Sequence, residues 1–83
     1  MSDLVSLRTQ INKIDKELID LLDRRMMKCR AIMRCKDVIF DSEREADVVR
    51  NMRSSCVSVL SKDDIDEFAA FVLQMSKMIM KRR

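Results

Sequence analysis

The sequence of 83 residues contains no glycine, proline, histidine, tryptophan or tyrosine. A chain that lacks the residues that most often form turns is typically almost entirely helical. Strand patterns are missing too, because the richest β-branched stretch, residues 57–59, is too short to form a strand. The absences therefore predict an all-α fold with few turns.

Cysteine is scarce: Cys29, Cys35 and Cys56 form no Cys-x-x-Cys pair, and there is no histidine to join them. This spacing predicts neither a zinc site nor a disulfide framework. We expect three small, buried or half-buried thiols in a reducing compartment. Because no charged-then-apolar leader opens the chain and no apolar run approaches about 18 residues, we expect a cytoplasmic protein without a membrane partner.

The excess of positive charge is small, because the formal net charge is +3. Acidic and basic residues are interleaved along most of the chain. The one purely basic cluster, residues 81–83, is explained by the helix dipole, which favours cations at a helix C-terminus. Aromatic platforms for stacking bases are also missing. We therefore expect no nucleic-acid partner.

The stretch from Leu4 to Lys36 carries apolar residues at helical spacing, which predicts one continuous helix. The apolar positions are Leu4, Leu7, Ile11, Ile14, Leu18, Leu22, Cys29 and Ile32. At about 1.5 Å per residue this helix would be roughly 50 Å long, too long to be buried by its own short chain. Since a domain of this size is close to the limit for a stable core, we expect an oligomer.

Two cations fall inside the apolar arc of this helix. At about 100° per residue, Arg25 and Lys36 project within about 20° of each other. Both fall in the middle of the arc that holds Leu7, Ile11, Leu18 and Ile32. A desolvated cation without a counter-charge costs several kcal/mol, so each needs an anion to face. The acids of the same helix mostly point elsewhere. Either another segment or a bound ligand must supply the negative charge.

A second helix is predicted after a loop over residues 37–41. Asp41 and Ser42 are both N-cap types, and Ser42 with Glu45 has the form of a capping box. Arg44 and Glu45 lie one turn before the apolar side, close to the predicted position of Lys36. As an alternative, Glu45 only completes the cap or forms a structural ion pair. The apolar side is predicted to hold Val48, Val49, Met52, Cys56 and Val59.

A third helix is predicted to begin after Ser61, which has the N-cap residue type and is followed by acids in the first turn. Its inner side is predicted to hold Ile65, Phe68, Ala69, Val72, Leu73, Ser76, Ile79 and Met80. Ser76 is the one polar residue of that row. A lone serine in such a row usually bonds to its own backbone, so Ser76 alone indicates no function.

The order of a long, a short and a medium helix, with these cations and acids on the inner faces, resembles the all-helical chorismate mutases. The resemblance covers essentially the whole chain. The stretches that carry it are Leu7-Arg8 with Ile11 and Ile14-Asp15, then Leu21-Leu22-Asp23-Arg24-Arg25, then Lys36, and then Asp41-Ser42-Glu43-Arg44-Glu45. The resemblance implies a single domain over residues 1–83 and an intertwined helical-bundle homodimer.

By this resemblance the enzyme converts chorismate to prephenate in a pericyclic rearrangement that needs no cofactor and no metal. The implied catalytic residues are Lys36, Arg25 and Glu45. The implied substrate-binding residues are Arg8, Arg25, Lys36, Asp41, Arg44, Glu45 and Ser76. Arg8 would act in trans, on the site of the partner chain. Such a dry pocket lined by cations would hold a dianion in its reactive conformer and stabilise developing charge.

One position departs from the family. Met80 stands where the family usually has Gln or Glu, and a thioether cannot donate a hydrogen bond to the ether oxygen. Either the activity is reduced, or Lys77 or Gln74 substitutes, or the chain binds a related ligand without efficient chemistry. Two other functions stay open: a relative that eliminates pyruvate from isochorismate, which Glu45 disfavours, and a non-catalytic helical interaction module.

Overall fold

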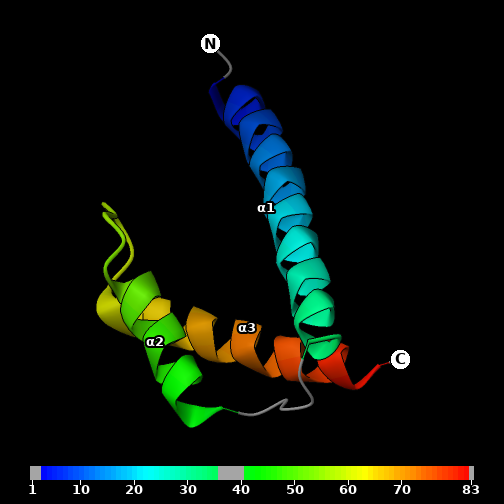
Figure 1. Cartoon of the computed structure of the whole chain (residues 1–83). Coiled ribbons are helices and arrows are strands. Elements are labelled where there is room, and N and C mark those ends of the chain that lie inside the picture. The colour runs from blue at the N-terminus through cyan, green and yellow to red at the C-terminus, as the bar shows by residue number, and fades with distance from the viewer. Residues whose placement is uncertain (1–2, 36–40, 83) are drawn as a thin grey trace.

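A computed structural model of the chain describes residues 3–35 and 41–82. Within these ranges it contains three α-helices and no strand (Figure 1). Helix α1 spans Asp3–Met33, α2 spans Ser42–Arg53 and α3 spans Lys62–Lys81. The predicted all-α fold, with a long, a short and a medium helix, is confirmed for the described residues.

Helix α1 ends earlier than the apolar pattern predicted. The N–H of Arg34 bonds to the carbonyl of Ala31 and that of Cys35 to the carbonyl of Ile32, at 3.1 and 2.8 Å. Such i to i+3 bonds tighten the last turn and satisfy carbonyls that would otherwise have no partner. Lys36 and the predicted loop over residues 37–40 lie outside the described residues.

Helix α2 is capped by Asp41, whose Oδ1 accepts hydrogen bonds from the backbone N–H groups of Glu43 and Arg44 at 3.1 and 3.2 Å. The predicted capping box of Ser42 with Glu45 is therefore wrong, because Ser42 is already the first helical residue. Because Asp41 caps the helix, the Glu45 side chain is not used by a capping box and can make other contacts.

The end of α2 also differs from the prediction, which placed Cys56 and Val59 on its apolar side. The helix ends at Arg53, and the hydroxyl of Ser54 donates to the carbonyl of Asn51 at 2.7 Å. Serine side chains compete for helix-end carbonyls in this way. Cys56 and Val59 therefore lie in the connection to α3, and Val59 is 91% exposed.

Helix α3 begins where the sequence predicted. The Ser61 hydroxyl accepts from the N–H of Asp64 at 3.0 Å, and the Asp64 carboxylate accepts from the N–H of Ser61 at 2.9 Å. This reciprocal pair is a capping box, which satisfies two N–H groups that the helix itself cannot.

Helix α3 is the centre of the fold, because it packs against both α1 and α2. Figure 1 shows α2 lying beside α3, and α1 rising from the C-terminal end of α3. The buried apolar side chains of this core are Met26, Val48, Ile65, Ala69 and Val72. Phe68, which was predicted to face inward, is 55% exposed. One chain therefore covers only part of the predicted inner side of α3.

The chain is extended rather than compact. Its radius of gyration is 15.8 Å, whereas a compact chain of this length would have about 12 Å. Its accessible surface is 7035 Å², whereas a compact monomer of this mass would expose roughly 5,150 Å². The excess of about 1,900 Å² indicates that one chain leaves a surface that a compact protein would bury.

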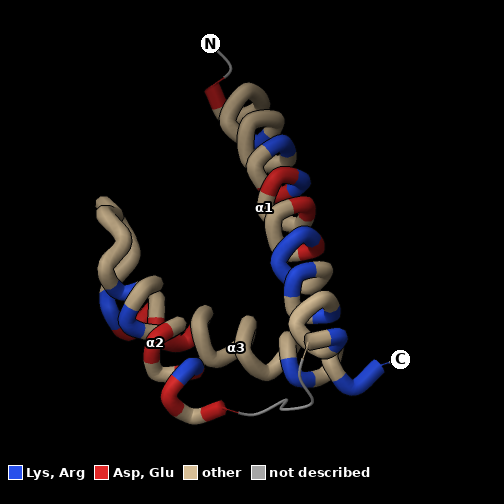
Figure 2. The backbone as a smooth tube through the Cα atoms, in the orientation of Figure 1, with Lys and Arg blue, Asp and Glu red and all other residues tan. Residues whose placement is uncertain are grey.

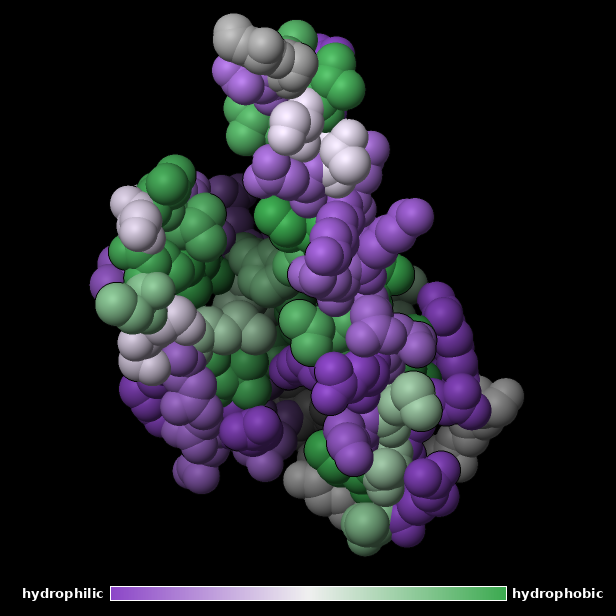
Figure 3. Space-filling model, turned by 90° about the horizontal axis from the view of Figure 1, so that it is seen from above, coloured by the Kyte–Doolittle hydropathy of each residue, from purple (hydrophilic) through white to green (hydrophobic). Residues whose placement is uncertain are grey.

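Much of the exposed surface is apolar. The apolar positions of α1 form a stripe along the helix, and those in its first half are each more than half exposed. They are Leu4, Leu7, Ile11, Ile14 and Leu18. Figure 3 shows apolar side chains gathered in the middle of its view, between α1 and the α2 end of the molecule. In Figure 2 charges of both signs follow one another along α1, whereas the middle of α3 has none. No helix in residues 3–35 and 41–82 is long and apolar enough to cross a membrane.

The capping box generates a stability prediction. Replacing Ser61 by alanine removes the acceptor for the Asp64 N–H, and such cap losses cost about 1 kcal/mol. We expect Ser61→Ala to lower the free energy of unfolding by that amount in urea denaturation at one fixed protein concentration. Ser58→Ala, an exposed serine of the preceding connection, serves as the control. Equal stability of the two variants would contradict the cap.

Candidate functional site

A cleft lies where the end of α1 and the start of α2 meet the C-terminal half of α3. Its volume is about 100 Å³. The lining residues come from all three helices and from the cap of α2, and are Arg25, Cys29, Ile32, Asp41, Arg44, Glu45, Val48, Leu73, Ser76, Lys77 and Met80. Five of the residues that the sequence predicted for a site, from three separate stretches, therefore surround one cleft.

Arg25 is the central cation of the cleft. Its side chain is half-buried, and its Nη1 donates to the Ser76 hydroxyl at 2.6 Å and lies 3.8 Å from the Cys29 sulfur. Both partners are neutral, and no carboxylate of the described residues forms an ion pair with Arg25. The prediction that Arg25 faces inward is confirmed. Its positive charge remains available to an anion in the cleft.

Ser76 holds this cation in place. The side chain is only 6% exposed, and its hydroxyl donates to the carbonyl of Val72 at 2.7 Å while accepting from Arg25. The sulfur of Met26 lies 3.7 Å away. The bond to its own backbone is the one usual for a helical serine. The bond to Arg25 joins α1 to α3 and could not be read from the sequence of α3.

The first turn of α2 contributes Asp41, Arg44 and Glu45. The Asp41 carboxylate is used by the helix cap, and Arg44 is exposed at the edge of the cleft. Glu45 is half-buried, and its Oε2 lies 3.0 Å from the Nζ of Lys77. A structural ion pair was one alternative for Glu45, and its partner among the described residues is Lys77 of α3.

Lys77 and Gln74, the two possible substitutes for the Gln or Glu that Met80 replaces, lie on different sides of α3. Met80 itself lines the cleft, and so does Lys77. Gln74 instead lines a different cavity on another side of α3. Of the two residues considered as substitutes for the missing Gln or Glu, Lys77 therefore shares the cleft with Arg25 and Gln74 does not. No local pattern predicts that Lys77 meets Glu45, because the two residues are far apart along the chain.

Arg8 does not lie at this cleft. It is an exposed residue of α1, about 26 Å along the helix axis from Arg25 at roughly 1.5 Å per residue. No rotamer of arginine spans that distance. Arg8 therefore does not reach the cleft of its own chain. Lys36, the second predicted inward cation, lies outside the described residues.

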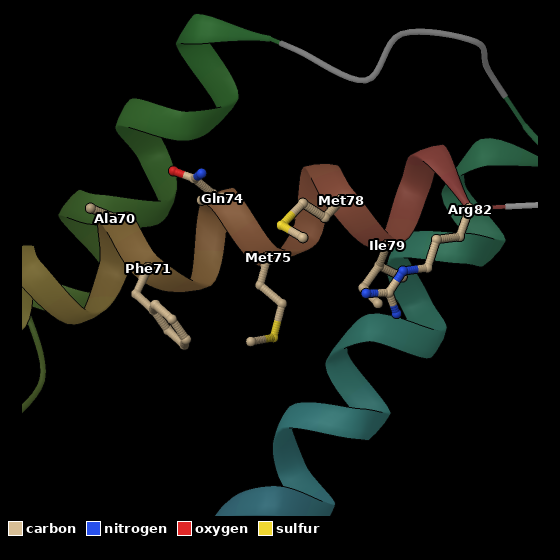
Figure 4. Close-up of a pocket in the computed structure, with 7 residues that line it drawn as sticks. All are labelled: Ala70, Phe71, Gln74, Met75, Met78, Ile79 and Arg82. Atoms are coloured by element: carbon tan, nitrogen blue, oxygen red, sulfur yellow. The ribbon is translucent and has the colours of Figure 1, made fainter.

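A larger cavity of about 740 Å³ runs along another side of α3 (Figure 4). It is lined by Ala70, Phe71, Gln74, Met75, Met78, Ile79 and Arg82. Figure 4 shows Phe71 and Met75 projecting from α3 on the side away from α2. Because its walls are mainly apolar and come from one helix, this groove suits the packing of another helix better than the binding of a small polar ligand.

Positive charge is in slight excess among the described residues that line the cleft. Its described lining includes three cations, Arg25, Arg44 and Lys77, against two acids, Asp41 and Glu45. No group of three or more His, Cys, Asp or Glu side chains within residues 3–35 and 41–82 could hold a metal ion. The fold and the cleft thus define a small all-helical protein with a cationic site built from separate helices.

Comparison with known families identifies the chain within that class. The sequence model of the family described as chorismate mutase type II matches residues 7–81, and the chain belongs to this family. Searches among curated proteins and among solved structures gave no match. The resemblance that the motifs indicated is thereby confirmed over almost the full length of the chain.

The Arg25–Ser76 contact generates a second prediction. Ser76→Ala removes the acceptor of a half-buried guanidinium, and leaving a buried polar group unpaired costs about 1–3 kcal/mol. We expect thermal unfolding of Ser76→Ala at a clearly lower temperature than that of the control Ser55→Ala, an exposed serine outside the helices. A melting temperature equal to that of the control would show that the contact contributes nothing to stability.

Proposed function

We propose that the chain is a chorismate mutase, which converts chorismate to prephenate, and that it works as a homodimer over residues 1–83. Its membership of the chorismate mutase type II family supports the reaction. The observation that carries the proposal is the state of Arg25, a half-buried guanidinium at the cleft whose partners among the described residues are a hydroxyl and a thiol. A buried cation of this kind is stabilised when an anionic ligand binds beside it.

The proposed reaction is an intramolecular rearrangement in which one carbon–oxygen ether bond breaks as one carbon–carbon bond forms. No atom enters or leaves the substrate, so the protein needs no nucleophile. It must hold a dianion in its compact reactive conformer and stabilise negative charge on the ether oxygen as the bond breaks. Preorganised cations in a site shielded from water meet both requirements.

Each site residue has a role that the family resemblance implies. Arg25 and Arg8 of the partner subunit would bind the two carboxylates, because the planar guanidinium matches a carboxylate. Lys36 would donate to a carboxylate and to the ether oxygen. Ser76 would bind a carboxylate beside Arg25.

The roles proposed for the start of α2 concern the ring hydroxyl of the substrate. Glu45 would accept a hydrogen bond from this hydroxyl, and Arg44 would lie beside it. Asp41 would fix the backbone of the turn by capping α2, which agrees with its two bonds to backbone N–H groups. These assignments make Lys36, Arg25 and Glu45 the proposed catalytic residues.

A second copy of the chain is the proposed cover for the exposed apolar surface. If each chain buried its excess of about 1,900 Å², the interface would total about 3,800 Å², within the range of obligate homodimers. The exposed half of the α1 stripe and the groove along α3 supply complementary apolar surfaces. The cleft volume of about 100 Å³ is also below the 300 Å³ or more of typical ligand sites. A partner that brings Arg8 would complete it.

The proposed enzyme should be slow for its class. Met80 lines the cleft, and its thioether cannot donate a hydrogen bond to the ether oxygen. Losing one donor aimed at developing charge typically reduces the rate by about 10²- to 10³-fold.

The direct test follows chorismate by absorbance and identifies the product. We expect prephenate, and we expect Arg25→Ala and Lys36→Ala each to reduce kcat/KM by about 10²-fold or more with helicity retained. Lys28→Ala, an exposed cation of α1, is the control. Release of pyruvate would identify the isochorismate lyase reaction instead. No turnover, with no stabilisation by a bicyclic transition-state mimic, would leave the non-catalytic helical module.

A shared site makes a separate prediction about mixed subunits. Arg8→Ala and Arg25→Ala homodimers should both be nearly inactive. A heterodimer of the two variants has one site without either substitution, so mixing equal amounts should restore about a quarter of the wild-type rate when subunits exchange randomly. Exchange is verified with differently tagged chains. Verified exchange without recovered activity would contradict the role of Arg8 in trans.

A further inference from the structure

Lys77 lines the cleft, yet neither the family resemblance nor the sequence assigns it a defined role. It follows Ser76 on α3, and its Nζ lies 3.0 Å from the Oε2 of Glu45 on α2. The two side chains are 34% and 24% exposed. The pair thus joins two helices at the wall of the site, beside the residues that would contact the ligand.

Two other ion pairs of the described residues provide a comparison. Arg50 pairs with Asp47 within α2, and Arg53 pairs with Asp66 near the connection between α2 and α3. All four of these side chains are more than 40% exposed, and none lines the cleft. Exposed pairs contribute little because water screens them. The Lys77–Glu45 pair is more shielded, so its effect on the orientation of the side chains is larger.

Within residues 3–35 and 41–82, Lys77 is the ion-pair partner of the Glu45 carboxylate. The N–H groups at the start of α2 bond to Asp41, so the cap does not hold the Glu45 carboxylate. A glutamate side chain has three rotatable bonds, and fixing it costs conformational entropy. A cation from a second helix offsets this cost and selects the rotamers that point along the cleft wall.

Lys77 also balances the charge of the cleft. The cations Arg25, Arg44 and Lys77 exceed the acids Asp41 and Glu45 by one among the described lining residues. Without Lys77 the count falls to zero, and the Glu45 carboxylate stands without its ammonium next to an incoming dianion. Like charges within a partly desolvated site repel strongly.

We propose that Lys77 is a positioning residue whose ammonium group holds the Glu45 carboxylate in the orientation needed to accept a hydrogen bond from a hydroxyl-bearing dianion, and offsets its charge. The role of Glu45 rests on the proposed mutase function. Lys77 acts through Glu45, and its effect therefore depends on the carboxylate being present.

A double-mutant cycle tests this dependence. The variants are Lys77→Met, Glu45→Gln and the pair combined, with Lys77→Arg as the conservative change and Lys81→Met as the matched control in the last turn of α3. Lys81 is exposed and does not line the cleft. For each full-length protein, kcat and KM for chorismate are measured with helicity and melting temperature.

We expect Lys77→Met to lower kcat/KM about tenfold, through a lower kcat and a higher KM. Lys77→Arg and Lys81→Met should stay within threefold of wild type. In the Glu45→Gln background, Lys77→Met should change kcat/KM less than threefold, because a neutral amide leaves no charge to hold or offset. A loss of similar size in both backgrounds, or no loss in either, would overturn the role of Lys77.

The same cycle separates this proposal from the proposed reaction. Dissociation constants for a bicyclic dicarboxylate transition-state mimic are measured in parallel by calorimetry. The wild-type protein could be inactive yet bind the mimic, with Lys77→Met weakening binding only when Glu45 is present. This result would overturn the mutase reaction and support the role of Lys77. An active enzyme with independent effects of the two substitutions would overturn only the role of Lys77. A wild-type protein that neither reacts with chorismate nor binds the mimic would overturn both.

Discussion

The length of α1 is the constraint on which the rest of the structure depends. With 31 residues the helix is about 46 Å long, whereas the 20 residues of α3 extend over about 30 Å. Helix α3 packs on α1 near its C-terminal end, where Met26 is the one buried residue of α1. The apolar side chains in the N-terminal half of α1 are therefore more than half exposed within the part of the chain that the structure describes. The extended shape, the exposed leucines and isoleucines, and the distance of Arg8 from Arg25 all follow from this mismatch in length.

The cleft lies at the end of α1 that α3 does cover, where all three helices meet. Arg25 donates there to the neutral hydroxyl of Ser76, while of the two acids in the described lining Asp41 caps α2 and Glu45 pairs with Lys77. Within residues 3–35 and 41–82 no carboxylate forms an ion pair with Arg25. A structural ion network would instead pair Arg25 with one of these acids, so the arrangement supports the proposed anion site.

Local patterns predicted the helices and the inward direction of Arg25, because helical periodicity and N-cap chemistry act within a few residues. The same reasoning failed at Ser42, since Asp41 is an equally good cap one residue earlier. It also failed at Cys56 and Val59, where the apolar spacing continues past the end of α2. The contact between Lys77 and Glu45 could not be predicted from the sequence, because it depends on how α2 and α3 pack. The exposure of Phe68 could not be predicted either, because it depends on how much of α3 a single chain covers.

The two sides of α3 are interleaved along its last turns. Met75, Met78 and Ile79 line the apolar groove, whereas Ser76, Lys77 and Met80 line the cleft. Because neighbouring residues differ by about 100° around a helix, a rotation of α3 that improves the fit of one side misdirects the other. A helix that packs in the groove would fix the rotation of α3 about its own axis. It would thereby also fix the direction in which Ser76 points. Assembly and ligand affinity would then be thermodynamically linked, each changing the other by the same free energy.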